Sequence, residues 1–109
     1  MNYNVRASKK FTKELKKLSK KYPSLKNEVI ELFAELAENP TMGTPLRDNV
    51  YKIRLAIASK NKGKSGGARV ITFVKIIDEM VLLLSIYNKG EKDTISDAEI
   101  DALLEEAEE

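Results

Sequence analysis

The sequence contains no cysteine and no histidine. Without cysteine the protein has no disulfide bond, no thiolate metal site and no cysteine nucleophile. Without histidine it lacks the commonest general base and metal ligand. Any acid–base chemistry must therefore use lysine, arginine, tyrosine or carboxylate side chains.

Long apolar runs are absent as well. None approaches the roughly 20 residues that a membrane-spanning helix needs, and the first residues form no apolar signal segment. We therefore expect a cytoplasmic protein with no membrane partner. The 109 residues suffice for one domain, 1–109, with a single core.

The net charge of +2 conceals two oppositely charged ends. Residues 1–26 carry nine Lys or Arg side chains against one acid, Glu14. Residues 91–109 carry nine acids against one lysine, Lys92. A basic segment of this kind could bind a polyanion, but solvated helix faces give the same pattern. Charge alone leaves both alternatives open.

Hydrophobic periodicity predicts the order β-α-α-β-β-β-α, an α+β fold in which an antiparallel sheet packs on a helical hairpin. Ser8 suits the N-cap of the first helix, and Ser96 with Glu99 forms a capping box for the last. Residues 41–49 read as a loop. The strands are expected at 2–7, 50–58, 68–77 and 80–87, and the first two helices at 9–22 and 24–38.

The strand expected at 50–58 alternates cleanly. Its apolar residues (Tyr51, Ile53, Leu55, Ile57) point to one face, and Lys52 and Arg54 point to the other. Such alternation is typical of a sheet with one face on the core and the other in solvent.

The glycine-rich segment 58–65 matches the permissive form of a phosphate-binding loop. That loop requires a helix to begin at its Lys-Ser pair, whereas Gly66, Gly67 and a β-branched run follow here. The context argues against nucleoside triphosphate hydrolysis. The loop lysines could still contact a phosphate backbone without reading sequence, or the segment is an ordinary solvated hairpin loop. These lysines are Lys60, Lys62 and Lys64.

Two turn lengths fit the hairpin formed by strands 68–77 and 80–87. A two-residue turn puts Arg69 on the opposite face from Tyr87 and Lys89. A three-residue turn pairs Ile77 with Val81, sets Arg69 opposite Lys89 and gives one almost wholly apolar face. We predict the three-residue turn, because a slip of one residue would bury charges at several kcal/mol each.

In that register the solvent side of the sheet gathers Lys52, Arg54, Arg69, Tyr87 and Lys89. Phosphodiester cleavage by the 2′-OH of RNA needs a base, cations for the phosphorane charge and a proton donor for the leaving oxygen. Without histidine, a tyrosine or lysine must move the protons, and Tyr87 could also stack on a base. A merely polar outer face remains the structural alternative.

Three segments of this region resemble the RelE/ParE superfamily of bacterial type II toxins, nearest to its HigB-type, RelE-like branch. They are G-K-S-G-G-A-R-V-I-T-F-V (63–74), L-L-L-S-I-Y-N-K-G-E-K (82–92) and I-S-D-A-E-I-D-A-L-L (95–104). The resemblance covers most of the chain and implies the element order given above.

The resemblance implies an mRNA interferase that cleaves mRNA in the ribosomal A site and is inhibited by a cognate antitoxin. We expect this enzyme to need no cofactor or metal and to bind no DNA directly without the antitoxin. Catalytic roles carry over to Arg69 and Lys89, and more weakly to Tyr87 and Arg54. The expected RNA-binding residues are Lys52, the three loop lysines named above, and Lys13, Lys16 and Lys17 of the first helix.

Two other functions stay open at this point. The ParE branch shares the fold but acts on gyrase, and a toxin relic could bind RNA or antitoxin without catalysis. The convergent cations around Tyr87 favour the nuclease, because a protein-binding toxin does not need them. The chain has no histidine near its C-terminus and no obvious carboxylate base, so the general base is not identified.

Overall fold

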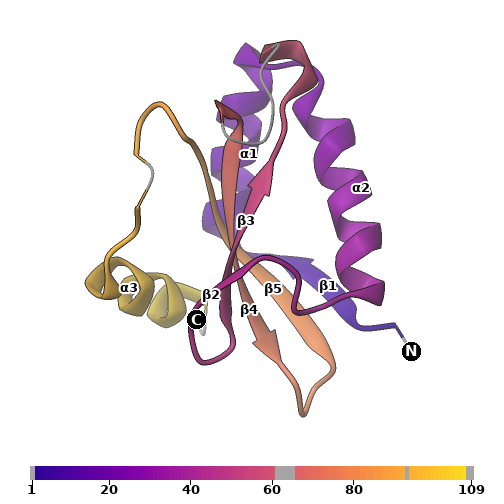
Figure 1. Ribbon diagram of the computed structural model, residues 1–109, viewed down its shortest axis with the longest axis vertical. Helices are drawn as coiled ribbons and strands as arrows, with labels where there is room; N and C mark the ends of the chain where they lie inside the picture. Colours follow the sequence, from indigo (N-terminus) through magenta and orange to yellow (C-terminus); the bar gives the residue numbers. More distant parts are fainter. Residues whose placement is uncertain (1, 61–65, 93, 108–109) are drawn as a thin grey trace.

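A five-stranded sheet lies between a helical hairpin and a single helix (Figure 1). The computed structural model describes residues 2–60, 66–92 and 94–107. The strand order is β1-β5-β4-β3-β2, antiparallel throughout except that β1 runs parallel to β5. The elements in chain order are β1 (Asn4–Ala7), α1 (Lys9–Lys21), α2 (Leu25–Glu38), β2 (Thr44–Arg47), β3 (Val50–Leu55), η1 (Ala58–Lys60), β4 (Ala68–Lys75), β5 (Met80–Asn88) and α3 (Asp97–Ala107).

The two N-terminal helices form as the sequence predicts. The Ser8 hydroxyl caps α1 by accepting a hydrogen bond from the Phe11 amide at 3.1 Å. Both apolar stripes then pack on the sheet, with Phe11 and Leu25 fully buried. The predicted α+β class and helical hairpin are confirmed.

The segment expected to be a loop contains an additional edge strand, β2. Its pairing with β3 brings Arg47 opposite Val50, so only Asp48 and Asn49 form the turn. Asn49 has a φ of 64°, in the left-handed region that asparagine tolerates better than most residues. The prediction of a loop was wrong here, and the Asp-Asn pair was the signal of a tight hairpin.

The predicted register of the β4–β5 hairpin is also wrong. Arg69 lies opposite Tyr87 rather than Lys89, and Lys75 pairs with Met80, so the turn has four residues instead of three. The register shifts once more between Ile71 and Thr72, where β5 carries an extra residue. The burial argument failed because both faces of this hairpin are apolar and both are covered.

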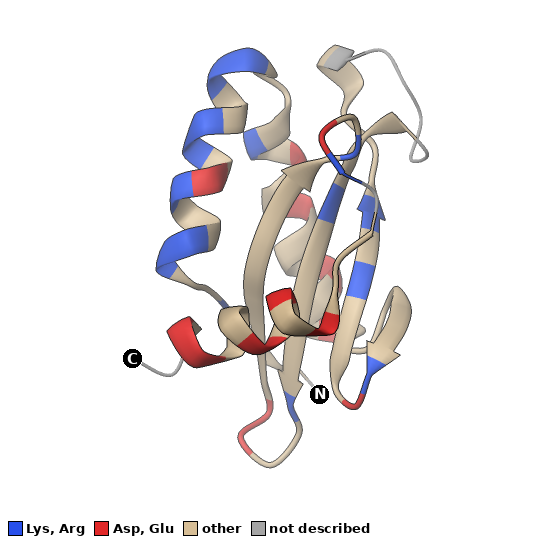
Figure 2. Cartoon of the chain, turned by 90° about the vertical axis from the view of Figure 1, so that its left-hand side faces the viewer, with Lys and Arg blue, Asp and Glu red and all other residues tan. Residues whose placement is uncertain are grey.

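The second face of the sheet, expected to be in solvent, is covered by α3. Ile100 and Leu103 of α3 pack with Val50, Ile71 and Leu84, one from each of the three central strands. Figure 2 shows α3 lying across the strands. The sheet therefore has two apolar clusters, one against the α1–α2 hairpin and one beneath α3.

Candidate active site beneath the third helix

Three residues expected in the active site form one row across the sheet. Arg54 of β3 pairs with Arg69 of β4, and Arg69 pairs with Tyr87 of β5. Directly opposed residues of antiparallel strands point to the same face. The row is thus on the face that α3 covers, with Lys52 in the neighbouring row at the β3 end.

The row is largely enclosed, contrary to the prediction of a solvent-facing site. Arg69 is 2% exposed and Tyr87 is 5% exposed, while Arg54 is exposed and Lys52 is half-buried. Tyr87 packs in the apolar cluster with Ile100 and Leu103. Its ring is therefore not open for base stacking in this conformation.

Gly67 allows β3 and β4 to lie close together next to the row. A Cβ atom at this position would lie 2.1 Å from the carbonyl oxygen of Leu55, so only glycine allows β3 and β4 to approach this closely. Lys89 follows β5, and its amide donates to the Gly67 carbonyl at 3.0 Å. The backbone of Lys89 therefore lies at the same end of the sheet as Arg69.

Lys92 is a cation of this site that the sequence reasoning missed. Its Nζ lies 4.9 Å from the centre of the Tyr87 ring, within the range of a cation–π interaction. The same ammonium pairs with the Glu99 carboxylate at the start of α3. The sequence signal was the position of Lys92 between Tyr87 and a recognised capping-box glutamate.

Glu99 joins the loop to α3 through both of its oxygens. Oε2 accepts from Lys92, while Oε1 accepts from the backbone amide and the hydroxyl of Ser96 at 3.1 and 3.2 Å. The hydrogen bond from Lys92, followed by that from the Ser96 amide, holds the pKa of Glu99 below its usual value. The predicted capping box is present, and its glutamate also serves as the counter-ion of Lys92.

A second ion pair attaches α3 at the opposite edge of the sheet. Arg47 of β2 binds Asp101 at 2.7 Å and lies 4.0 Å from Asp97. The acidic N-terminal half of α3 thus reaches from the last strand in the sheet order to the loop that follows β5.

Glu14 is the carboxylate that contacts β5 directly beside Tyr87. Strand β1 ends at Ala7, so β5 loses its parallel neighbour after Leu83. Ser8 and Glu14 replace it: the Ser8 hydroxyl donates to the Leu84 carbonyl at 3.1 Å, and Glu14 Oε1 accepts from the Ile86 amide at 3.2 Å. Glu14 Oε1 also accepts from the Ser85 hydroxyl at 2.8 Å.

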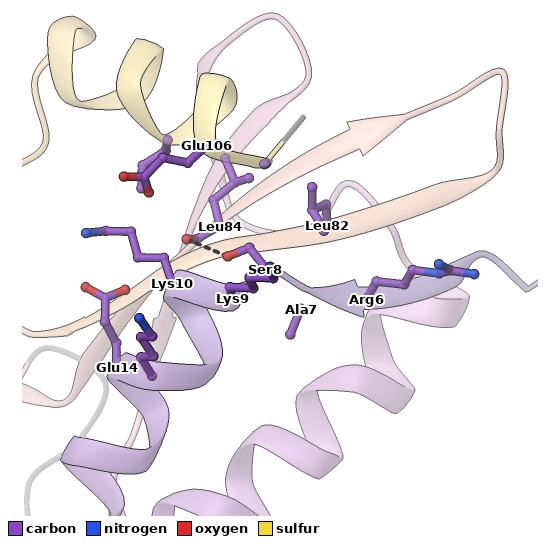
Figure 3. Close-up of a pocket in the computed structure, with 12 residues that line it drawn as sticks. Arg6, Ala7, Ser8, Lys9, Lys10, Glu14, Leu82, Leu84 and Glu106 are labelled. Carbon is purple, nitrogen blue, oxygen red and sulfur yellow. Dashed lines mark hydrogen bonds between the residues drawn. The ribbon is translucent and has the colours of Figure 1, made fainter. Parts of the chain in front are cut away.

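A cleft of about 720 Å³ lies where the start of α1, the edge of β5 and the end of α3 meet (Figure 3). Its lining is basic on the α1 side and apolar along β5, and Glu106 of α3 lies on its third side. A smaller cavity of about 170 Å³ shares Lys10 and Glu14 with the cleft and extends to Ser85 and Lys92. The smaller cavity is thus lined both by α1 and by the loop that carries Lys92 beside Tyr87.

The other predicted RNA-binding lysines are not gathered in this row. Lys13, Lys16 and Lys17 are exposed on α1, which packs on the opposite layer, and Figure 2 shows the basic side of that helix. Lys62 and Lys64 lie outside the described residues, as does the side chain of Lys60.

The base of the glycine-rich loop is nevertheless anchored to α2. The Ala58 amide donates to Glu28 Oε2 at 2.7 Å, and the Ser59 amide donates to Ser24 Oγ at 2.9 Å. The loop therefore leaves the sheet beside the α1–α2 turn.

Comparison with known proteins agrees with this fold. The family model described as the RelE toxin of the RelE/RelB toxin–antitoxin system matches residues 4–109. The chain belongs to the RelE toxin family. It is accordingly the toxin component of a toxin–antitoxin system.

Two solved structures illustrate the similarity. A mutant of E. coli toxin RelE in the free state is 20% identical, with a TM-score of 0.61 over 98% of this chain and 95% of that one. The toxin–antitoxin complex RelBE2 from Mycobacterium tuberculosis is also 20% identical, with a TM-score of 0.61 over 81% of this chain and 99% of that one. At this identity the likeness concerns the fold.

Membrane-spanning helices and acidic metal clusters are both missing from the described part of the chain. No helix there is long and apolar enough to cross a membrane. Within the same residues, no group of three or more acidic, histidine or cysteine side chains could hold a metal ion.

Proposed function

We propose that this RelE-family toxin is a metal-independent endoribonuclease that cleaves mRNA in the ribosomal A site. The observation that carries the proposal is the row of Arg54, Arg69 and Tyr87, with Lys92 against the tyrosine ring. A phosphate placed on this face would meet cations supplied by β3, β4 and the loop after β5.

The reaction that suits these residues is internal transesterification. The 2′-oxygen loses its proton and bonds to the adjacent phosphorus, the bond from phosphorus to the 5′-oxygen breaks, and that oxygen takes up a proton. The products are a 2′,3′-cyclic phosphate and a 5′-hydroxyl. Lysine or tyrosine side chains of this face would carry the two protons.

Arg69 is suited to the charge that develops on the non-bridging oxygens. Its guanidinium offers donors in a planar fork that matches the oxygens of a phosphate. Because Tyr87 packs against α3, RNA would reach the row when α3 shifts away from the sheet.

Family membership supports the proposed partners, a cognate antitoxin together with the ribosome and its mRNA, as well as a cytoplasmic location. Membership of the HigB-type branch stays a prediction. A gyrase-inhibiting activity of the ParE kind is the second candidate, since a shared fold does not fix function.

Primer extension on mRNA from a reconstituted translation reaction tests the proposal. Added toxin should produce new 5′ ends within A-site codons, and omission of ribosomes should abolish them. A gyrase supercoiling assay runs in parallel. Inhibition of gyrase without mRNA cleavage would replace the nuclease with the ParE-like function.

A further inference from the structure

Lys92 is placed to contact a ligand of the site. Its ammonium lies against the Tyr87 ring, and its side chain is 40% exposed. It also lines the smaller cavity, which shares Lys10 and Glu14 with the lining of the basic cleft along α1. Lys10 and Glu14 of α1 and Glu106 of α3 line the same cavity. Lys92 therefore shares the cavity with side chains of both helices.

The counter-ion of Lys92 is held by backbone rather than by Lys92 alone. Glu99 Oε1 is fixed in the capping box of α3, which leaves Oε2 directed at the ammonium. A glutamate is ionised at neutral pH, and the hydrogen bonds from Lys92 and Ser96 lower the pKa of Glu99 further. It presents one anionic oxygen to Lys92, as a phosphodiester would.

We propose that Lys92 is a phosphate-binding residue of the RNA site and that Glu99 occupies it until an RNA phosphate oxygen takes the place of the carboxylate. This rests on the endoribonuclease function proposed above. Glu99 is 46% exposed, and exposed ion pairs are weak enough to be exchanged for another anion. The row of Arg54, Arg69 and Tyr87 thereby gains a third cation, and α3 gains a role in setting RNA affinity.

The variant Glu99→Gln isolates the charge. Glutamine at this position retains the capping box, because its amide oxygen can accept from Ser96, so α3 should keep its start. Glu105→Gln is the matched control: Glu105 is exposed on the same helix and belongs to no ion pair among the described residues. Lys92→Gln and Lys92→Arg complete the set.

The measurement is single-turnover mRNA cleavage on programmed ribosomes as a function of toxin concentration. Glu99→Gln should lower the half-saturating concentration by up to about fivefold, the range expected for an exposed pair. Lys92→Gln should raise it with little change in the saturating rate, and Lys92→Arg should largely restore it. In the Lys92→Gln background, Glu99→Gln should have no effect.

Each outcome decides the matter. Glu99→Gln acting equally with and without Lys92, or acting no more than Glu105→Gln, overturns the assignment of Lys92 while leaving the nuclease in place. A loss of the saturating rate in Lys92→Gln with an unchanged half-saturating concentration also overturns it. Wild-type toxin that cleaves nothing removes the proposed function, and the role of Lys92 falls with it.

Discussion

Replacing Glu14 should reveal how the unpaired edge of β5 is held. Glu14→Ala removes the acceptor of two hydrogen bonds, one from the Ile86 amide and one from the Ser85 hydroxyl. Ile86 is 1% exposed and Ser85 is 4% exposed, so neither donor regains water easily. The neighbouring strand β1 has already ended and cannot substitute.

The expected cost follows from these contacts. Hydrogen bonds to charged acceptors contribute about 1.5–3 kcal/mol each, and the Ser85 hydroxyl can rotate to another partner, so Glu14→Ala should lose about 2–3 kcal/mol. For a domain of this size that corresponds to roughly 10 °C in melting temperature. Glu14→Gln keeps an oxygen acceptor and should lose less than about 1 kcal/mol.

Thermal unfolding by circular dichroism measures both variants, with Ser85→Ala completing a double-mutant cycle. The stability losses of the two substitutions should be non-additive, because each substitution removes the hydrogen-bond partner of the other residue. An alanine variant that melts within a degree or two of wild type refutes the edge argument, as does a glutamine variant that melts as low as the alanine variant.

The variant Glu14→Gln also distinguishes a structural role of Glu14 from a catalytic role. Glu14→Gln should cleave mRNA as fast as wild type, because we assign Glu14 to holding β5 and not to proton transfer. A folded Glu14→Gln protein with strongly reduced cleavage would instead make Glu14 the missing general base.

Three further predictions concern other parts of the molecule. Gly67→Ala should destabilise the protein by about 1–3 kcal/mol, typical of overpacking, because its Cβ would meet the Leu55 carbonyl, and urea unfolding measures the loss. Because the pKa of Glu99 is lowered in the folded protein, its ionised carboxylate stabilises the fold at pH values above the ordinary pKa of 4.5. That stabilisation is lost as the pH falls, so Glu99→Gln should flatten the acid limb of a stability–pH curve. Replacing Lys13, Lys16 and Lys17 with glutamine should reduce the salt slope of ribosome binding by about one unit for each phosphate that is no longer neutralised, and an unchanged slope would make these lysines a solvated helix face.

Local chemistry made much of the fold predictable. The N-caps Ser8 and Ser96 satisfy backbone amides within three residues, so a short stretch of sequence contains the whole interaction. The alternation of β3 was equally clear, and its odd-numbered apolar residues do face the helical hairpin. These features depend on neighbours in the chain and on nothing distant.

The register of β4 against β5 depended on information that local patterns lack. The sequence argument assumed one buried face, whereas α3 covers the other and makes Ile71, Leu84 and Tyr87 core residues too. With both faces apolar, burial no longer distinguishes the registers, and the bulge adds a further shift. Arg69 and Tyr87 still share a face, because the true pairing there differs from the predicted one by two residues and a side chain changes face with every single residue.

The sequence identified three residues of the site but not their surroundings in the fold. Arg54, Arg69 and Tyr87 were named from the sequence and lie in one row. The burial of Tyr87 arises from the packing of α3 against the sheet, which joins residues far apart along the chain, and Lys92 lies in the loop between β5 and that helix. The spacing of Lys92 and Glu99 alone could not show that one carboxylate serves both a helix cap and an ion pair.

The most direct test of the central claim is single-turnover A-site cleavage by Arg69→Lys, with Arg69→Ala beside it. We predict that removal of the guanidinium in Arg69→Ala reduces the rate about 10²–10³-fold at saturating ribosome, as loss of one transition-state donor does elsewhere. Arg69→Lys should recover only part of that rate, because an ammonium cannot make the bidentate contact. Ribosome binding should be nearly unchanged in both variants. Folded Arg69→Ala protein that cleaves mRNA as fast as wild type would contradict the account.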